Sequence, residues 1–316
     1  MNEIRFLDGA RTRAALDPRR VLEAVERALI RVSRDEVSAP PRIAARTPNG
    51  LLGAMPGHVP GIGLAAKLVS VFADPERPGR SSHRGLVVLF DPEDGRPLAL
   101  MDAEPLTEIR TAASATLGAR ALARAGGGPV AVVGTGAQAR AQLALLAALA
   151  PGTPVRVAGR DAGRAASAAA LHPAGRPAPG IEEAVRGAGT VFCCTGAARP
   201  VIDRAWLAPG THVSSVGGSD GPEVDAATVR DAALFAEWAG AAATAPPSGA
   251  HELQDLPAGR SVTLLGAVLA GEVPGRRRED ELTLFKSTGH AALDVAAAQA
   301  AHAVAVARDW GTRVAL

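Results

Sequence analysis

Apolar residues recur with helical spacing near the start of the chain. Between Asp17 and Val32 the apolar positions are Val21, Leu22, Val25, Ala28, Leu29 and Val32. Steps of three and four residues of this kind are typical of an amphipathic helix. Asp17 supplies an N-cap and Pro18 a proline at the first helical position. We therefore predict a helix that begins after Asp17 and buries one face.

After Pro40-Pro41 the pattern changes to short apolar runs separated by turn residues. The runs cover 50–55, 63–72 and 85–91, and turn signals lie at Pro56-Gly57, at 75–79 and at Asp94-Gly95. This pattern predicts an antiparallel or mixed sheet with hairpins. Helical composition returns over 107–124.

From Gly126 onward, short strands alternate with helices. The predicted strands are 129–133, 154–158, 190–194 and 212–216, and the predicted helices are 137–149, 162–171 and 181–186. This alternation favours a parallel, doubly wound sheet. A last helix, 290–308, is rich in alanine. The chain has no internal repeat and no long linker.

Composition limits the class of protein. A chain of 316 residues can bury two cores, and 47% apolar with 21% charged residues excludes a mainly disordered chain. The net charge of +2 gives no general attraction to nucleic acid. We find no signal peptide and no uncharged apolar stretch of about 18 residues that would span a membrane. We therefore expect a cytoplasmic protein.

Cysteines and histidines give no metal or hydrolase motif. Cys193 and Cys194 are adjacent in an apolar run, which favours a buried strand over a zinc site. The histidines, among them His58 and His212, lack a spacing such as H-E-x-x-H. His83 lies beside Arg84-Gly85 and faces either a cleft or solvent. We predict no metal site.

A glycine-rich turn joins the predicted strand 129–133 to the predicted helix 137–149. It reads Gly134-Thr135-Gly136-Ala137-Gln138-Ala139. Glycines allow a tight turn and a close approach to a pyrophosphate, which the positive end of the helix attracts. Ala139 replaces the third glycine, where helix–strand packing needs a small residue. We predict a dinucleotide site here; the alternative is a tight turn without a ligand.

The end of the next strand bears on the choice of cofactor. It reads Ala158-Gly159-Arg160-Asp161. A carboxylate there usually binds the ribose 2′-hydroxyl of NAD, whereas an arginine accommodates the 2′-phosphate of NADP. Arg160 therefore favours NADP(H), with NAD(H) as the alternative, and a solvated loop arginine is the other interpretation of Arg160.

Several segments, taken in order, resemble the ornithine cyclodeaminase and mu-crystallin family. The glycine turn is one of them, and 106–113 resembles the family's L-T-x-x-R-T-A-A. The others are Gly210-Thr211-His212-Val213 with Val216-Gly217-Gly218, Leu284-Phe285-Lys286-Ser287-Thr288-Gly289, and Ala291-Ala292-Leu293-Asp294. From their order and spacing together the chain is identified as a member.

The resemblance implies an α/β fold: a Rossmann-type doubly wound parallel sheet inserted in an α+β substrate-binding and dimerisation domain. We place that domain at 1–122 plus 290–316, and the Rossmann domain at 123–289. The resemblance also implies a homodimer. The cofactor-binding residues that we expect are Gly134, Thr135, Gly136, Ala137, Gln138, Arg160, Thr195, Gly196, Val216, Gly217, Ser287 and Gly289.

Three cations match the family's carboxylate-binding set: Arg42, Lys67 and Arg110. An α-imino or α-amino acid needs its carboxylate fixed so that Cα faces C4 of the nicotinamide, and a bidentate arginine does this well. Lys67 lies in the apolar run 64–72, where an unpaired ammonium is unfavourable. We also assign Lys67 a catalytic role. The alternative for each cation is a solvated surface position.

Two acids of the family's cyclodeaminases are displaced or missing. The stretch before Met55-Pro56 reads Leu52-Gly53-Ala54, where the family enzyme has a glutamate. The family aspartate directly follows two glycines, whereas here Ser219 separates Gly218 from Asp220. Ser219 could occupy the position without an acid. Asp220 is our candidate general acid/base, and the alternative is an aspartate that only turns the loop.

The resemblance and the site residues together predict an NAD(P)H-dependent oxidoreductase that acts on the CH–NH or CH–NH2 group of an α-imino or α-amino acid. A ketimine or cyclic imino acid reductase, running in reverse as an amino-acid dehydrogenase, fits the two departures. One alternative is a cyclodeaminase with internal NAD recycling. Another is a non-catalytic NADP-binding protein of the mu-crystallin type.

Overall fold

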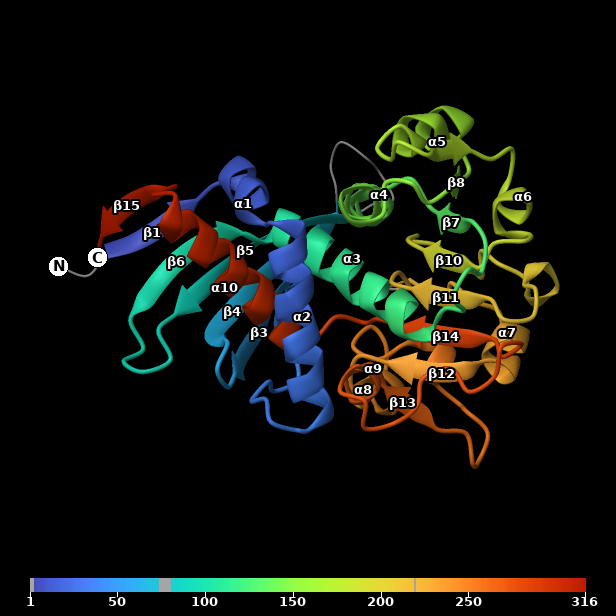
Figure 1. Ribbon diagram of the computed structural model, residues 1–316. Helices are drawn as coiled ribbons and strands as arrows, with labels where there is room; N and C mark the ends of the chain where they lie inside the picture. Colours follow the sequence, from blue (N-terminus) through green and yellow to red (C-terminus); the bar gives the residue numbers. More distant parts are fainter. Residues whose placement is uncertain (1–2, 74–80, 219) are drawn as a thin grey trace. The chain divides into compact units, whose positions relative to one another are not determined.

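The computed structural model describes residues 3–73, 81–218 and 220–316. The chain divides into two compact units, 1–110 with 290–316, and 111–289 (Figure 1). The helix α3 (Ala103–Leu122) contributes its first turns to one unit and the remainder to the other. The domain ranges 1–122, 290–316 and 123–289 stay a prediction.

The first unit is built on a mainly antiparallel sheet. Its strands are β1 (Glu3–Leu7), β2 (Ile43–Thr47), β3 (Gly50–Val59), β4 (Gly63–Ala73), β5 (Ser81–Phe90), β6 (Pro97–Asp102) and β15 (Thr312–Ala315). Over the described residues the order is β15-β1-β6-β5-β4-β3-β2, and only β1 and β6 pair in parallel. The helices are α1 (Gly9–Ala15), α2 (Pro18–Ser33) and α10 (Ala291–Ala307).

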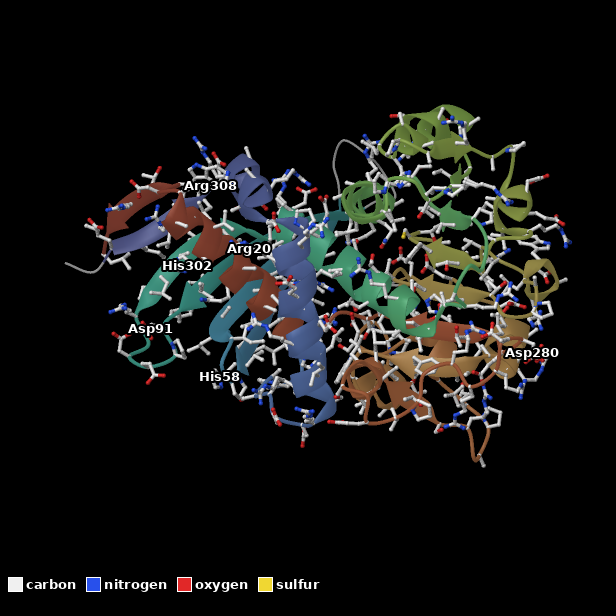
Figure 2. The ribbon with its side chains drawn as sticks, viewed as in Figure 1. Arg20, His58, Asp91, Asp280, His302 and Arg308 are labelled. Atoms are coloured by element: carbon white, nitrogen blue, oxygen red, sulfur yellow. The ribbon has the colours of Figure 1, made fainter. Side chains whose placement is uncertain are left out.

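The predicted helix after Asp17 is confirmed. The Asp17 carboxylate accepts hydrogen bonds from the backbone N of Arg19 at 3.1 Å and of Arg20 at 3.0 Å. The apolar positions predicted to face the core are all buried. Arg20 lies on the exposed side of the helix (Figure 2). Capping and periodicity therefore fix this element locally.

One face of the sheet is covered by α10, which packs against β3, β4 and β5 and is itself packed against α2 (Figure 1). One register row on this face runs Met55, Lys67, Val87 and Met101. All four side chains are buried. Lys67 is thus the charged member of an otherwise apolar row in the core.

The turn predicted at Pro56-Gly57 is wrong, because β3 continues to Val59. The pairing with β2 stops at Ala54, and the next bridge on that edge joins His58 to Ser38. Pro56 falls between these two bonded positions, so its missing N–H removes no ladder hydrogen bond. The turn at Asp94-Gly95 joins β5 to β6, and the one at 75–79 lies outside the described residues.

The second unit carries a parallel sheet. Its strands are β7 (Val130–Val133), β8 (Val155–Ala158), β9 (Gly175–Pro177), β10 (Thr190–Cys193), β11 (His212–Ser215), β12 (Ala233–Ala236), β13 (Val262–Leu264) and β14 (Thr283–Lys286). Its helices are α4 (Ala137–Leu149), α5 (Ala162–Ala169), α6 (Ile181–Val185), η1 (Arg204–Trp206), α7 (Ala226–Asp231), α8 (Gly240–Ala243), η2 (His251–Leu253) and α9 (Leu265–Leu269).

The strand order confirms the predicted doubly wound α/β fold. Over the described residues it is β13-β12-β14-β11-β10-β7-β8-β9, and every pair is parallel. The chain runs outward from β7 through β8 to β9 and then returns to β10 on the other side of β7. This reversal makes the carboxyl ends of β7 and β10 a topological switch point, where such sheets bind ligands.

None of the helices in 3–73, 81–218 and 220–316 combines the length and the apolar character that crossing a membrane would need.

Candidate active site

Lys67 on β4 and Arg110 on α3 converge on Asp294 of α10. The Lys67 Nζ lies 3.0 Å from Oδ1 and 2.9 Å from Oδ2 of Asp294. The Arg110 Nε donates to the same Oδ1 at 3.0 Å. The three side chains are 6%, 7% and 2% exposed, respectively. Two buried cations therefore share one buried carboxylate, and we call these three residues the basic triad.

The charges of the basic triad act strongly on one another. Burial lowers the pKa of Lys67; Asp294 opposes this shift, whereas Arg110 and Arg42 add to it. Burial by itself would raise the pKa of Asp294, but Lys67 and Arg110 outweigh it and hold that pKa below its ordinary value. Arg42, exposed just before β2, thus lies close enough to influence Lys67. The arrangement has an excess of positive charge and suits an anion such as a carboxylate.

The nearest acid on α3 does not remove this excess. Glu108 lies two residues before Arg110, and its carboxylate pairs with Arg13 at 2.8 Å. On the neighbouring strand, Met55 stands opposite Lys67, and Gly53 lies on the same face. The stretch that lacks the family glutamate therefore presents an apolar surface beside Lys67.

The part played by Asp294 was not predicted from the sequence, where the residue stood only within a family motif. Its surroundings in the sequence nevertheless contain a signal. Asp294 is the one acidic residue between Ala291 and Ala307, in a helix made mostly of alanine and valine. A buried carboxylate in such a helix needs a cationic partner, and the sheet beneath it supplies Lys67.

The glycine turn has the form that a dinucleotide requires. Gly134 has φ +122°, and a Cβ there would lie 2.4 Å from the carbonyl oxygen of Cys194, so glycine is required. A Cβ on Gly136 would meet no described heavy atom within 4 Å, which leaves open space above the turn. Gly136 caps α4 without a side-chain hydrogen bond among the described residues. The first amides of α4 are therefore available to a phosphate.

Gln138 adds a second indication at this turn. Its Oε1 is buried and has no hydrogen-bond partner among the described residues. Thr135 packs on the neighbouring loop, since a Cβ on Gly159 would lie 2.8 Å from its Cγ2. Arg160 follows on that loop and is exposed, whereas the Asp161 carboxylate caps α5 by accepting from the N of Arg164 at 2.7 Å.

The other predicted cofactor residues follow β10, β11 and β14. Because all strands are parallel, these loops lie at the same edge of the sheet as the glycine turn. Gly196 is exposed, and a Cβ on it would meet nothing described within 4 Å. The remaining residues are Thr195, Val216 and Gly217, which are half-buried, and Ser287 and Gly289, which are buried.

Glu237, which directly follows β12, holds the loop after β14 and was also missed. Its carboxylate accepts from Ser287 Oγ at 2.8 Å and from Gly289 N at 2.9 Å. It further accepts from Ser114 Oγ at 2.7 Å. Glu237 therefore holds the loop after β14 in place through Ser287 and Gly289.

Comparison with known proteins shows the family of this chain. The model of the ornithine cyclodeaminase/mu-crystallin family matches residues 8–308. The chain belongs to this family. The Delta(1)-pyrroline-2-carboxylate reductase of Paracoccus denitrificans is 33% identical over 270 residues, which cover 78% of this chain and 81% of the relative.

Two solved structures of relatives share the fold over nearly the whole chain. One is the Thermococcus litoralis Delta(1)-pyrroline-2-carboxylate reductase in complex with NADH and L-proline, at 27% identity and a TM-score of 0.87. It covers 98% of this chain and 100% of its own. The other is an archaeal alanine dehydrogenase dimer with bound NAD, at 27% identity, a TM-score of 0.85 and 99% coverage of both chains.

Among the residues that differ from the family pattern, Asp220 is exposed on the loop after β11. Gly218, with φ +91°, precedes it, and Ser219 lies outside the described residues. The catalytic role of Asp220 stays a prediction.

The histidines lie on separate elements. His212 is buried at the start of β11, between Thr283 Oγ1 and Ser214 Oγ at 2.9 Å each, and burial lowers its pKa to about 3. His58 on β3 and His302 on α10 stand apart in Figure 2. The side chain of His83 lies outside the described residues.

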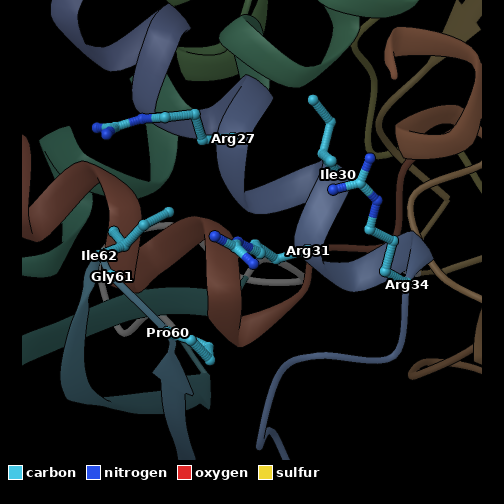
Figure 3. A pocket seen from close by; sticks show the side chains of 7 residues that line it. All are labelled: Arg27, Ile30, Arg31, Arg34, Pro60, Gly61 and Ile62. Carbon is cyan, nitrogen blue, oxygen red and sulfur yellow. The ribbon is translucent and has the colours of Figure 1, made fainter. Parts of the chain in front are cut away.

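A separate cavity of about 210 Å³ lies in the first unit between α2 and the β3–β4 turn (Figure 3). Its lining residues are Arg27, Ile30, Arg31, Arg34, Pro60, Gly61 and Ile62. Arg31 is ion-paired with Glu36. The lining contains neither a member of the basic triad nor Arg42.

Proposed function

We propose that this protein is an NAD(P)H-dependent oxidoreductase that reduces the C=N bond of an α-imino acid and, in reverse, oxidises the α-amino acid. The observation that carries the proposal is the basic triad, in which Lys67 and Arg110 share the single carboxylate of Asp294. A substrate carboxylate would supply the missing negative charge. The relatives named as pyrroline-2-carboxylate reductases and alanine dehydrogenase support this chemistry.

The residues divide the work of the reaction. Arg110, Lys67 and Arg42 bind the carboxylate, and Asp294 holds the first two in place. The nicotinamide, when bound, supplies a hydride to Cα. The imine nitrogen takes up a proton, and we assign Asp220, or a water that it orders, as the proton donor. We assign Lys67 as the other catalytic residue.

The surroundings of Lys67 favour a substrate without a second charge. Met55 and Val87 flank it in the register row, and β3 offers no acid on that face to receive a terminal ammonium. We therefore favour cyclic imino acids such as pyrroline-2-carboxylate or piperideine-2-carboxylate over diamino acids.

For the cofactor we favour NADP(H) over NAD(H). Arg160 is exposed on the loop that Thr135 contacts, where it is free of the helix-capping duty that occupies Asp161. An arginine suits a 2′-phosphate better than a ribose hydroxyl. The solved relatives contain NADH and NAD and therefore do not support NADP(H). The preference rests on Arg160 and Asp161 alone.

The deciding experiment follows the near-ultraviolet absorbance of NADPH, and then of NADH, with a panel of cyclic and linear α-imino acids. We expect oxidation of NADPH, faster than that of NADH, with at least one cyclic imine. Ammonia release from ornithine or lysine without net cofactor change would instead make the protein a cyclodeaminase. Tight NADPH binding without turnover in either assay would make it a binding protein.

We further propose a homodimer formed through the face of the first sheet that α10 leaves uncovered. Leu52, Leu68 and Leu86 are 50%, 37% and 41% exposed there, and Leu68 and Leu86 are register partners. A second copy is the occupant that the dimeric alanine dehydrogenase relative supports. In sedimentation velocity we expect Leu68→Glu to be monomeric. The control Val306→Glu, on an exposed position of α10, should remain dimeric.

A further inference from the structure

A single buried carboxylate joins the loops that follow β10 and β11. Glu223 is 0% exposed. Its Oε1 accepts from Thr195 N at 2.6 Å and Thr195 Oγ1 at 2.7 Å. Its Oε2 accepts from Ser215 Oγ and Gly217 N, each at 2.7 Å. Both oxygens are therefore fully engaged, one with each loop.

Lys286, at the end of β14, supports the same loops from the next strand. Its Nζ donates to Ser215 Oγ at 2.8 Å, to Gly217 O at 2.9 Å and to Glu252 Oε1 at 3.0 Å. The Glu252 Oε1 also accepts from the backbone N of Glu223 at 2.7 Å. Three neighbouring strand ends are thus tied into one buried network, which we call the acidic network.

The two loops touch so closely that no side chain fits between them. A Cβ on Gly217 would lie 1.9 Å from the carbonyl oxygen of Thr195 and 2.6 Å from Cδ of Glu223. The loop surface at Gly196, by contrast, opens onto space in which a Cβ would meet nothing described within 4 Å. The acidic network therefore lies beneath a surface that is free to hold a ligand.

We propose that Glu223 is a positioning residue for the nicotinamide half of the cofactor, an inference that rests on the proposed function. A dinucleotide spans the switch point of a doubly wound sheet, with its pyrophosphate on the glycine turn. With Arg160 and β8 on the adenosine side, the nicotinamide half lies over the ends of β10 and β11. Glu223 fixes these two loops relative to each other and makes no contact with the cofactor itself.

Glu223→Gln tests this with little change in size. The amide keeps one acceptor oxygen but turns an NH2 group toward two donors, so one of the two loops loses its anchor. By isothermal titration calorimetry we expect the Kd for NADPH to rise by about tenfold. We expect the Kd for adenosine 2′,5′-bisphosphate, which lacks the nicotinamide half, to stay unchanged. A purely structural role would weaken both ligands by the same factor.

The controls separate this inference from the proposed function. Glu183→Gln, on an exposed position of the same unit, should leave both affinities unchanged. Ser215→Ala removes one donor to Glu223 and should raise the Kd for NADPH by a smaller factor, which keeps the test open if Glu223→Gln does not fold. Equal weakening of both ligands, or no weakening in a folded variant, overturns the positioning role. Failure of the unmodified protein to bind NADPH or NADH overturns the proposed function instead, whereas binding of NADH alone overturns only the NADP(H) preference.

Discussion

The two units each bury a cluster of three charged side chains, and the clusters differ in sign. In the basic triad, Lys67 and Arg110 share the carboxylate of Asp294. In the acidic network, Glu223 and Glu252 share the ammonium of Lys286, directly or through Ser215. One cluster has an excess positive charge and the other an excess negative charge.

The clusters also differ in how completely the excess charge is hydrogen-bonded. The Glu223 carboxylate accepts four hydrogen bonds, two of them from backbone amides. In the basic triad, the described contacts of Lys67 and Arg110 with carboxylates are all to Asp294, so their remaining N–H groups have no second buried carboxylate among those contacts. A buried charge that already has its hydrogen bonds stabilises a loop, whereas one that lacks them is suited to a ligand. Glu252 Oε2 of the acidic network has no hydrogen-bond partner among the described residues, so the contrast between a positioning cluster and a binding cluster rests on Glu223.

The largest expected effect comes from breaking the basic triad at its acid. Asp294→Asn leaves Lys67 and Arg110 as two buried cations without a carboxylate. Removing one partner from a buried ion pair typically costs about 3–5 kcal/mol of the free energy of unfolding. We expect a loss in this range in urea unfolding. The double variant Lys67→Met with Asp294→Asn should recover part of it, and a single-variant loss below about 1 kcal/mol would contradict the arrangement.

Removing one cation should affect catalysis more than stability. Arg110→Met leaves Lys67 and Asp294 as a balanced pair, so the fold keeps its buried charges matched. The substrate carboxylate loses its guanidinium, and we expect kcat/KM for the imino acid to fall by about 10²–10³. Arg120→Met, at an exposed position of the same helix, is the matched control and should stay within a factor of about two.

The lowered pKa of Lys67 predicts opposite pH dependences for binding and stability. Burial, with Arg110 and Arg42, places this pKa below the ordinary lysine value of about 10.4. As the pH rises through it, the ammonium is lost, and the KM for the imino acid should rise by about tenfold per pH unit. Between this lowered pKa and the ordinary lysine value, Lys67 is neutral in the folded chain but still protonated in the unfolded chain. The free energy of unfolding should therefore increase with pH in that range.

Lys67→Arg is the control for both the KM and the free energy of unfolding, because a guanidinium stays protonated across this pH range. The alkaline rise in KM should then disappear. If it persists unchanged in Lys67→Arg, the titrating group is not Lys67.

The sequence predicted best what is decided locally. The cap at Asp17, the strand–glycine–helix unit around Gly134, and the alternation that makes the parallel sheet all depend on residues close in the chain. Lys67 stood out because a lysine within an apolar run requires an explanation. Arg110 stood out through the family motif that contains it.

The residues that were missed are defined by contacts across the fold. Asp294 is 227 positions from Lys67, and Glu223 is 28 positions from Thr195. Neither acid has a local sequence pattern that identifies its partner, and the strands β12, β13 and β14 were not among the predicted strands. Pro56 led to a wrong turn prediction for the opposite reason, because it is a strong local turn signal. Such a proline is tolerated within a strand where the neighbouring strand forms no hydrogen bond with that position.

The smallest expected effect comes from the same acid-to-amide exchange in the acidic network, where it separates the two clusters most directly. Glu252→Gln removes one of two negative charges and leaves Glu223 and Lys286 balanced. Its amide oxygen can still accept from Glu223 N and Lys286 Nζ, which now both bond to Oε1. We expect a loss of about 1 kcal/mol or less in urea unfolding, against the several expected for Asp294→Asn. Equal losses for the two variants would mean that burial alone, and not the sign of the excess charge, determines the effect.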